Sequence, residues 1–425
     1  MLDNADVVVV GAGIAGLATA HQLSGAGLSV TVLEAEPGVG GRMATDTVDG
    51  FRLDRVGPLF TAPEAAGVPL RPFAPGVLVH SDGRYGRWGA PHAPWSPRGA
   101  RGVARALAGA PRNPAVSLDQ ARLGASLVRL ATTPAQRLLT RTERTAREAL
   151  TARLPGRTVQ GVLRPLLAAL LGDLDLTTSS RRADLALRSF ARGRLGVPEG
   201  GSGALAERLA AALPPGSVRT GVRVTEASIS RVTTAEHGVF RCRAVVVATG
   251  GRTAAELVPG LCVPDYRAAT VLHHTAPLAP AADPVLLLES DVAGPVAHTA
   301  VMSTVDPSRA PAGRVLVTST VLGGPPADDD TERRVRKHLA TLYGVSTDDW
   351  ELLALHHTPH AFPVMRPPFD PERPVRLLAG LYVCGDHRGT GTPTGALATA
   401  RRAATALLAD LGVGTGSTAR GVEAA

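Results

Sequence analysis

The sequence predicts an α/β fold, and three separated stretches of the chain support this class. Residues 7–10 are four valines, and a glycine-rich turn and an apolar, helix-like segment follow them directly. Two later apolar runs, 243–250 and 380–386, also lead into glycine turns. A buried strand, a glycine turn and a helix in this order are typical of a Rossmann-like nucleotide-binding domain. We therefore expect a Rossmann-like domain in several segments, with an interleaved α+β substrate domain and a helical cap.

The first glycine turn has the spacing of a dinucleotide-binding motif. Gly11 permits the tight turn, Gly13 lets the backbone approach a pyrophosphate, and Gly16 lets the helix pack closely on the strand. The N–H groups of the first helical turn then face the phosphates. This turn adds two residues to the predicted site: Ile14 and Ala15.

A second strand, residues 29–33, ends in an acidic residue. Glu34 is placed to accept hydrogen bonds from the ribose of an adenosine, and Ala35 follows it. A carboxylate at this position would repel a 2′-phosphate, which disfavours NADP. Because the strand, the turn, the helix, the second strand and the acid all occur in register, we expect a dinucleotide site here.

Composition and charge restrict the class of protein. The chain has 425 residues, which is enough for two or three domains, and it has no apolar run long enough to span a bilayer. The net charge is +8, but the arginines are spread along the chain and aromatic residues are only 3%. Both features argue against a nucleic-acid partner. A basic patch that contacts anionic lipid at a membrane surface, or an acidic partner, stays open.

The cysteines and the first residues indicate a reducing compartment. Cys242, Cys262 and Cys384 are far apart and provide neither a disulfide framework nor a zinc site. No basic segment precedes the first strand, so we expect no secretory signal and a cytoplasmic location.

The order of the segments predicts how the domains are divided. The strand-bearing segments form the nucleotide-binding domain: residues 1–60, 195–256 and 376–412. The two excursions between them form the substrate domain: residues 61–194 and 257–375. Leucines recur at helical intervals between arginines at about 117–171, which predicts the helical cap, and residues 413–425 are expected to be a flexible tail. The second excursion is expected to contain strands at 269–273, 284–289, 315–321 and 350–356 and a helix at 330–343.

A second glycine motif follows Glu34 closely and suggests which dinucleotide is bound. Gly40-Gly41-Arg42 brings backbone N–H groups and a fixed cation to the same site, and residues 49–57 form an acid-then-glycine stretch. With these motifs the sequence resembles the flavin-containing amine oxidase superfamily, which includes protoporphyrinogen oxidase-like and phytoene desaturase-like enzymes. The resemblance implies FAD as the cofactor. We expect the flavin to be held non-covalently, because Cys384 should pack inward on a buried strand.

The resemblance also implies further contacts to FAD. In that superfamily a valine contacts the adenine through its backbone, a small-residue turn lies beside the pyrophosphate, and an aspartate binds the ribityl chain or a phosphate-linked hydroxyl. A C-terminal helix directs its positive end at N1 and O2 of the flavin, which stabilises the reduced ring. The matching positions in this sequence, with the end of the acid-then-glycine stretch, are Gly57, Pro58, Leu59, Val224, Thr249, Gly385, Asp386, Thr394, Gly395 and Ala396.

The candidate catalytic residues are histidines. Amine oxidases often use a lysine near flavin N5, but the sole lysine here, Lys337, belongs to a charged helix and is expected to be solvated. The usual aromatic residue of the C-terminal segment is also missing. His356 and His360 would share one face of a strand that resembles the family strand over the flavin, and His360 is the first choice. Either could accept a proton during oxidation, or be an ordinary polar residue at a domain seam. No acid or cysteine shares their spacing, so no metal is expected.

These observations predict an FAD-dependent oxidoreductase that dehydrogenates, or desaturates, a small hydrophobic metabolite, which we expect to belong to specialised metabolism. Hydride would pass to flavin N5, and oxygen or a quinone would reoxidise the flavin. Three alternatives stay open: a redox-neutral isomerase or cyclase, an oxidase of simple amines, and a flavin-binding protein without catalysis. The two substrate-domain segments, residues 61–194 and 257–375, contain no recognisable specificity motif. The sequence therefore identifies neither the substrate nor the oligomeric state.

Overall fold

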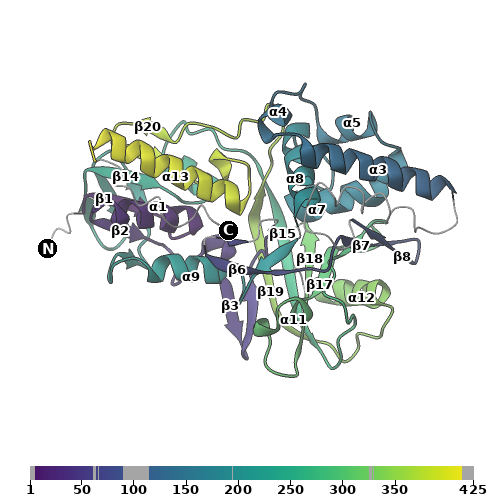
Figure 1. The fold of residues 1–425 in the computed structure, drawn as a ribbon. Coiled ribbons are helices and arrows are strands. Elements are labelled where there is room, and N and C mark those ends of the chain that lie inside the picture. The colour runs from purple at the N-terminus through teal and green to yellow at the C-terminus, as the bar shows by residue number, and fades with distance from the viewer. Residues whose placement is uncertain are drawn as a thin grey trace. The chain divides into compact units, whose positions relative to one another are not determined.

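The computed structural model describes residues 5–60, 64–65, 67–89, 114–193, 195–324, 328 and 330–413. The chain divides into two compact units (Figure 1). Unit 1 consists of residues 1–44, 203–265 and 370–425, and unit 2 consists of residues 45–202 and 266–369. Each unit is described by itself. The expected tail falls almost entirely outside the described residues.

Unit 1 is built on a six-stranded sheet of order β10-β2-β1-β14-β21-β20. The first five strands are parallel, and β20 is antiparallel to β21. Every residue of β1 and β14 is buried, as expected for central strands covered on both faces. The strand bounds are Val7–Val10 for β1, Val30–Leu33 for β2, Val218–Arg219 for β10, Ala244–Val247 for β14, Arg376–Leu378 for β20 and Leu381–Val383 for β21. The Rossmann-like sheet is therefore confirmed.

Helices and a small sheet complete unit 1. Helix α1 packs against both α13 and α9 (Figure 1). A three-stranded antiparallel sheet, β11-β12-β13, follows β10. The helices are α1 (Ile14–Gly25), η1 (Gly41–Met43), α9 (Gly203–Ala211), α10 (Gly251–Leu257), η4 (Asp386–Arg388) and α13 (Pro393–Asp410). The small sheet contains β11 (Val224–Ala227), β12 (Arg231–Thr234) and β13 (Val239–Arg241).

Unit 2 contains a seven-stranded sheet of order β19-β15-β18-β17-β16-β7-β8. All of its pairings are antiparallel except that of β16 with β7. Its strands are β7 (Val77–Ser81), β8 (Arg84–Trp88), β15 (Tyr266–Ala276), β16 (Leu287–Glu289), β17 (Val296–Val301), β18 (Val315–Leu322) and β19 (Glu351–Pro363). The remaining strands are β3 (Thr45–Val48), β4 (Phe51–Asp54), β5 (Glu64–Ala65), β6 (Val68–Pro72) and β9 (Gly196–Pro198). The predicted strands of the second excursion are present, and β19 runs seven residues beyond its expected end.

The helices of unit 2 confirm the predicted helical region and extend it. They are α3 (Pro114–Thr132), α4 (Ala135–Leu139), α5 (Ala146–Thr151), α6 (Gly156–Thr158), the π-helical turn η2 (Val159–Leu163), α7 (Arg164–Leu171) and α8 (Ser180–Arg192). We call this group the helical cap. Three further helices are α11 (Met302–Val305), η3 (Pro307–Arg309) and α12 (Thr331–Tyr343). No helix among the described residues is long and apolar enough to cross a membrane.

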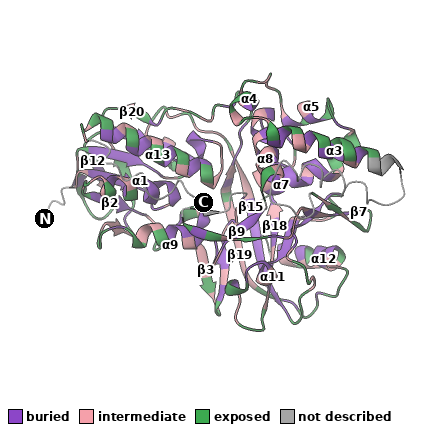
Figure 2. Ribbon diagram, in the orientation of Figure 1, coloured by how far each residue is buried: buried purple, intermediate pink, exposed green. Residues whose placement is uncertain are grey.

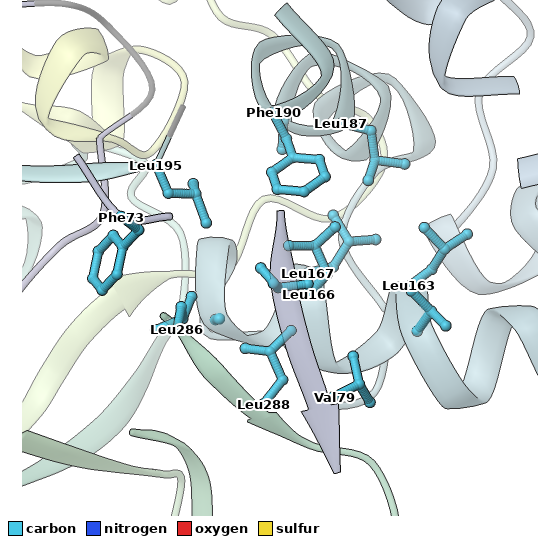
Figure 3. Packing of buried hydrophobic residues seen from close by; sticks show 14 of the residues in the cluster. Phe73, Val79, Leu163, Leu166, Leu167, Leu187, Phe190, Leu195, Leu286 and Leu288 are labelled. Atoms are coloured by element: carbon cyan, nitrogen blue, oxygen red, sulfur yellow. The ribbon is translucent and has the colours of Figure 1, made fainter. Parts of the chain in front are cut away.

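The main core of unit 2 joins the helical cap to the sheet. Leu187 and Phe190 of α8 belong to the same buried cluster as Leu288 of β16 (Figure 3). Helix α8 is buried along one side, and along the other its residues are of intermediate exposure, apart from the exposed Arg192 at its end (Figure 2). Burial of such side chains contributes about 25 cal/mol per Å² of apolar surface removed from water. The cap is therefore held by the hydrophobic interior of unit 2.

The units divide the chain differently from the predicted domains. Residues 45–60 and 195–202 lie in unit 2 rather than in the nucleotide-binding unit, and residues 257–265 and 370–375 lie in unit 1. Residues 45–60 belong to unit 2 because Phe51 and Leu53 are fully buried in its core.

Candidate functional site

The first glycine turn in unit 1 has the geometry that its spacing predicts. Gly11 has a φ of +104°, a conformation that favours glycine, and a Cβ there would lie 3.1 Å from the carbonyl oxygen of Ala248. A Cβ on Gly16 would lie 2.0 Å from the carbonyl oxygen of Gly11, so only glycine permits this approach of helix to turn. Gly13 differs, because a Cβ there would meet no protein atom within 4 Å. This open space is compatible with the phosphate group expected at Gly13.

The start of α1 is suited to an anion. Ile14, Ala15 and Gly16 occupy its first turn, and the first helical bond is donated by the N–H of Leu17 to the carbonyl of Gly13. The first turn contains no acidic residue. Its N–H groups and the positive end of the helix therefore provide the donors that a pyrophosphate needs.

Glu34 holds the turn in place as well as presenting a carboxylate. One of its oxygens accepts a hydrogen bond from the N–H of Ala12 at 2.7 Å, and the other accepts from the N–H of Glu36 at 3.0 Å. The side chain is buried at the end of β2, and the half-buried Ala35 follows it. Each carboxylate oxygen can accept a second bond, so ribose hydroxyls remain compatible with this arrangement.

The second glycine motif lies against the first. The N–H of Gly40 donates to the carbonyl of Ala12 at 2.9 Å, and Gly13 and Gly40 form an isolated β-bridge. Gly40 and Gly41 both have positive φ, at +108° and +56°. The expected convergence of the two glycine motifs on one site is therefore present.

Arg42 forms an ion pair with Asp386, which lies 344 positions later in the chain. The two guanidinium nitrogens donate to the two carboxylate oxygens at 2.7 and 2.8 Å. Burial by itself would raise the pKa of Asp386, but Arg42 holds the pKa of this carboxyl well below its usual range. The bidentate geometry fixes both side chains beside the glycine turns. Sequence analysis placed both residues at the cofactor, but nothing in the sequence paired them.

The C-terminal motif is shaped by close packing around Gly395. The side chain of Thr392 caps α13 by accepting from the N–H of Gly395 at 3.1 Å. A Cβ on Gly395 would lie 2.3 Å from Thr390 Oγ1, so the loop closes only on glycine. Thr394 is exposed at the first turn, whereas Ala396 is buried. The positive end of this helix is therefore available to stabilise a negatively charged group.

The turns after β14 and β21 meet the first glycine turn. A Cβ on Gly11 would lie 3.2 Å from the backbone N of Thr249, and a Cβ on Gly385 would lie 3.6 Å from the carbonyl oxygen of Thr249. Val224 begins β11, and the N–H of Val222, two residues earlier, donates to the carbonyl of Glu34 at 2.8 Å. These residues gather at the carboxyl ends of the parallel strands, where ligands bind in such sheets. The other predicted contacts, Gly57, Pro58 and Leu59, belong to unit 2 and are half-buried there.

The residues of unit 1 thus fit FAD. They combine an open cradle at Gly13, helix N–H donors without a competing acid, an acid at the ribose position and an arginine held by a carboxylate. Bound FAD would supply a hydride acceptor, and the chain would supply its orientation.

Unit 2 places His356 in a polar cluster that includes Asp46. The distance between His356 Nε2 and Asp46 Oδ2 is 3.1 Å, and Arg55 holds Asp46 through two hydrogen bonds of 3.0 and 2.9 Å. Nδ1 of His356 is buried and has no hydrogen-bond partner within the described part of the chain. Burial lowers the pKa of His356, and Asp46 opposes this effect. The ring is therefore neutral near pH 7, and bonding to Asp46 leaves the lone pair on Nδ1.

His360 does not join this cluster. Its ring lies edge-on to that of Tyr266, with the centroids 5.8 Å apart. His357, on the opposite face of the strand from His356, forms a 2.9 Å hydrogen bond through Nδ1 with the hydroxyl of Thr270. His356 is thus the one of the two predicted candidates that is paired with a carboxylate.

Sequence reasoning missed the buried partners of His356. The ring of His273 lies edge-on to His356 at 5.6 Å, and its Nε2 is 3.0 Å from the carbonyl oxygen of Asp54. The Asp54 carboxylate is buried and forms a 2.9 Å ion pair with the equally buried Arg309. No sequence motif links His273, Asp54 and His356. The pairing of β15 with β19 brings the two histidines together, and a hydrogen bond joins His273 to Asp54 at the end of β4. His273 and His274 stand out in the sequence as a histidine pair and as a further acid/base candidate by position, but nothing in the sequence places either beside His356.

One group in unit 2 has the composition of a metal site. Ligand atoms of His80, Glu289 and Asp291 all lie within 4.8 Å of one another. His80 Nδ1 is already 3.0 Å from Glu289 Oε2, and the Asp291 carboxylate accepts from Ser81 Oγ and the N–H of Asp82. Internal hydrogen bonds therefore explain this group. The prediction of no metal stays a prediction.

The sole lysine, Lys337, has the exposed position that the sequence predicts. Lys337 lies on the exposed side of α12, while its neighbours His338 and Leu339 are buried. This agrees with the solvated position expected from its charged helix.

Comparison with known proteins agrees with the fold and the cofactor motifs. An oxidoreductase from Methanosarcina mazei has a similar structure, with a TM-score of 0.72 and 16% sequence identity over 94% of this chain and 99% of that one. A putrescine oxidase variant has a TM-score of 0.68 and 18% identity over 96% of this chain and 99% of its own. At these identities the likeness shows the fold alone.

Sequence relatives match a short segment. A phytoene dehydrogenase from Streptomyces griseus is 52% identical over 58 residues, which are 14% of this chain and 11% of that enzyme. A putrescine oxidase from Kocuria rosea is 59% identical over 49 residues, or 12% of this chain and 10% of that enzyme. The family model of flavin-containing amine oxidoreductases, by contrast, matches residues 14–408. With the FAD-binding motifs converging in unit 1, this match confirms the expected resemblance: the chain belongs to the flavin-containing amine oxidoreductase family and is an FAD-dependent oxidoreductase.

Proposed function

We propose that this enzyme dehydrogenates a small hydrophobic molecule, and that His356 accepts the proton released at the oxidised C–H or N–H bond. The observation that supports this role is the contact of His356 Nε2 with Asp46 at 3.1 Å, which leaves Nδ1 without a partner among the described residues. The glycine turns, Glu34 and the Arg42–Asp386 pair would hold FAD, which would supply the hydride acceptor, and oxygen or a quinone would be the terminal oxidant, taking up two electrons and two protons to give peroxide or a quinol.

Asp46 would act by orienting His356. Its carboxylate accepts a hydrogen bond from the Nε2–H group of His356 and is itself held by Arg55, so the ring keeps one tautomer. After Nδ1 takes a proton, Asp46 would stabilise the resulting imidazolium.

The structure offers less support for an oxidase of simple amines. The only lysine is exposed on α12, and no aromatic residue occurs between Gly389 and Ala396. A redox-neutral isomerase or cyclase uses the same cofactor site and differs only in needing no oxidant. Turnover under strict anaerobiosis, without net reduction of the flavin, would identify that activity.

The first experiment is an anaerobic screen of metabolites for bleaching of the bound flavin. With a substrate in hand, His356→Ala should reduce flavin at least tenfold more slowly than wild type, a bound below the usual effect of about a hundredfold to ten-thousandfold for a positioned base. FAD content should be unchanged, since His356 lies in unit 2 and outside the FAD motifs of unit 1.

His360→Ala is the matched variant, because it removes a histidine from the same strand but outside the Asp46 cluster. We expect it to have the smaller effect. Wild-type rates in both variants across pH would exclude a histidine base, and steady peroxide release with simple amines would instead establish an amine oxidase. If no metabolite bleaches the flavin, catalysis by this chain would be in question.

A further inference from the structure

The helical cap carries most of the net positive charge of the chain. Of the 45 basic and 37 acidic residues in the sequence, 13 arginines and 6 acidic residues lie between Pro114 and Arg192. This segment therefore has a net charge of +7, and the rest of the chain, with 32 basic and 31 acidic residues, is nearly neutral. Arginines occur throughout the sequence, but in the cap the acidic residues do not balance them.

The two signs of charge also differ in burial within the cap. Of its six acidic residues, three are buried and one is of intermediate exposure: Asp119, Asp173 and Asp184, and Glu143. Eight of its arginines, by contrast, are exposed: Arg122, Arg129, Arg137, Arg144, Arg147, Arg153, Arg157 and Arg192. The two exposed acids are Glu148 and Asp175. The solvent-facing side of the cap is therefore predominantly basic.

Part of this charge lies on one layer of the cap. Residues 129–147 lie along α8, a helix of thirteen residues and about 20 Å, from one end to the other. At the end of α8, the side chain of Arg192 donates to the carbonyl of Ala131 at 3.0 Å, and at its start Ser180 Oγ accepts from the N–H of Arg144 at 3.2 Å. Since one side of this layer packs on α8, its exposed residues lie on the outer side.

Three exposed arginines of this layer have no anionic partner in the protein. Arg129 belongs to α3, Arg137 to α4, and Arg144 directly precedes the N-cap of α5; these helices all contact α8 (Figure 1). No hydrogen bond or ion pair joins their guanidinium groups to residues that the structure describes. We call these three residues the basic face. Their charge is permanent at physiological pH, so the basic face attracts anions from solution.

We propose that the basic face attaches the enzyme to membranes that contain anionic lipid. The choice of a lipid surface rests on the proposed function in one respect: a small hydrophobic substrate, and a quinone if that is the oxidant, dissolve in a bilayer and are reached there. Lipid headgroups also move laterally, so they can meet guanidinium groups on three separate elements without a complementary shape.

The attachment is peripheral and mainly electrostatic. No helix among the described residues could cross a membrane, and Leu118 is the one large apolar side chain that is exposed in the described part of the cap. Arginines near an anionic surface each contribute about 1 kcal/mol, which corresponds to about fivefold in affinity. The three residues of the basic face together account for about a hundredfold.

Binding is measured by sedimentation of the FAD-loaded enzyme with vesicles of phosphatidylcholine mixed with anionic phosphatidylglycerol, and with vesicles of phosphatidylcholine alone. At low ionic strength we expect binding to the mixed vesicles only. Added salt should release the enzyme, because the screening length falls from about 10 Å at about 0.1 M salt to about 3 Å at about 1 M. Equal binding to both kinds of vesicle, or binding that resists salt, would overturn the electrostatic attachment.

A triple variant tests the basic face directly. Arg129→Gln, Arg137→Gln and Arg144→Gln in one chain should weaken binding to the mixed vesicles about a hundredfold. Stability and FAD content should stay near wild type, because exposed substitutions usually change the free energy of unfolding by less than about 0.5 kcal/mol. Wild-type vesicle affinity in this variant would overturn the assignment to the basic face.

The matched control removes three charges from unit 1. Arg208, Arg241 and Arg401 are exposed there, and their combined change to glutamine gives the same net charge as the first triple variant. We expect this control to keep most of its vesicle affinity. An equal loss in the two variants would show that only the total charge matters and would overturn the proposal.

The remaining outcomes separate a lipid surface from other partners and from the proposed function. If the enzyme binds poly-glutamate but no vesicles, and the first triple variant loses that binding, the basic face serves an acidic protein and the lipid proposal is wrong. Vesicle binding requires no turnover, so anionic vesicles that bind an enzyme whose flavin no metabolite bleaches support the basic face while the dehydrogenase proposal fails alone. Dehydrogenation by an enzyme that binds no vesicles overturns only the basic face.

Discussion

Three glycines in or next to helix α1 should respond in three different ways to the same change to alanine. A Cβ on Gly16 would lie 2.0 Å from the carbonyl oxygen of Gly11, whereas ordinary van der Waals contact begins at 3.4 Å. A Cβ on Gly13, just before the helix, or on Gly25, at its end, would meet no protein atom within 4 Å. Because the added methyl group is the same, a difference in stability or FAD affinity among the three variants reflects the space around each glycine.

The expected magnitudes follow from these distances. Gly16→Ala must displace the helix from the turn, so it should lose both stability and FAD, with overpacking costing about 1–3 kcal/mol or more. Gly13→Ala should leave the stability of the apoprotein near wild type but place a methyl group where the phosphates fit. The same cost of about 1–3 kcal/mol would weaken FAD binding by about fivefold to more than a hundredfold. Gly25→Ala should bind FAD normally and gain up to about 1 kcal/mol from helix propensity.

The assay combines urea unfolding of the apoprotein with titration of FAD by flavin fluorescence. The decisive comparison is between Gly13→Ala and Gly25→Ala, because both should fold and only the first should lose cofactor. Equal FAD affinity in these two variants would refute the assignment of the space at Gly13 to the pyrophosphate. Wild-type stability of Gly16→Ala would refute the close packing of α1 on the turn.

Three further predictions concern the cofactor bond and the buried charges. Acid precipitation should release FAD into the supernatant, because Cys384 is fully buried beside Thr19; colour retained in the pellet would indicate a covalent bond. Arg309→Met should lower the free energy of unfolding by about 3–5 kcal/mol, since Asp54 would keep a buried charge, and Asp54→Asn in the same chain should restore part of the loss in urea titrations. Burial lowers the pKa of His298 to about 4, so the unfolded chain binds more protons between about pH 6.5 and 4 and stability falls as pH decreases through that window. His298→Met should flatten this dependence in urea unfolding at several pH values, and an unchanged slope would contradict it.

The cofactor unit could be predicted because its information is local. The order of valine strand, glycine turn, helix, strand and acid fixes the relative places of Gly11, Gly13, Gly16 and Glu34 within 34 residues. The later motifs at Thr249 and Asp386 follow buried strands, and the carboxyl ends of parallel strands meet at one edge of a sheet. The sequence did not show that Arg42 and Asp386 form an ion pair, because only the order of strands in that sheet brings these two residues together.

Unit 2 was harder to predict because its polar residues acquire their roles from distant partners. The role proposed for His356 depends on Asp46, which lies on β3. The sequence does not show that the β3–β4 hairpin packs in unit 2 rather than in unit 1.

Helix α8 is a second case in which the sequence does not show the environment of its polar residues. Four of its thirteen residues are arginines, a composition that reads as a solvated helix, yet Leu187 and Phe190 bury one side of it in the core. The arginine side chains of this helix therefore differ in how far they are buried and in what they contact. Arg181 and Arg188 are partly buried and donate hydrogen bonds to backbone carbonyl oxygens, whereas Arg182 is only 4% exposed. Since the cost of a buried charge depends on its partners and not on its identity, the environment of each arginine in this helix is set by contacts that no sequence motif encodes.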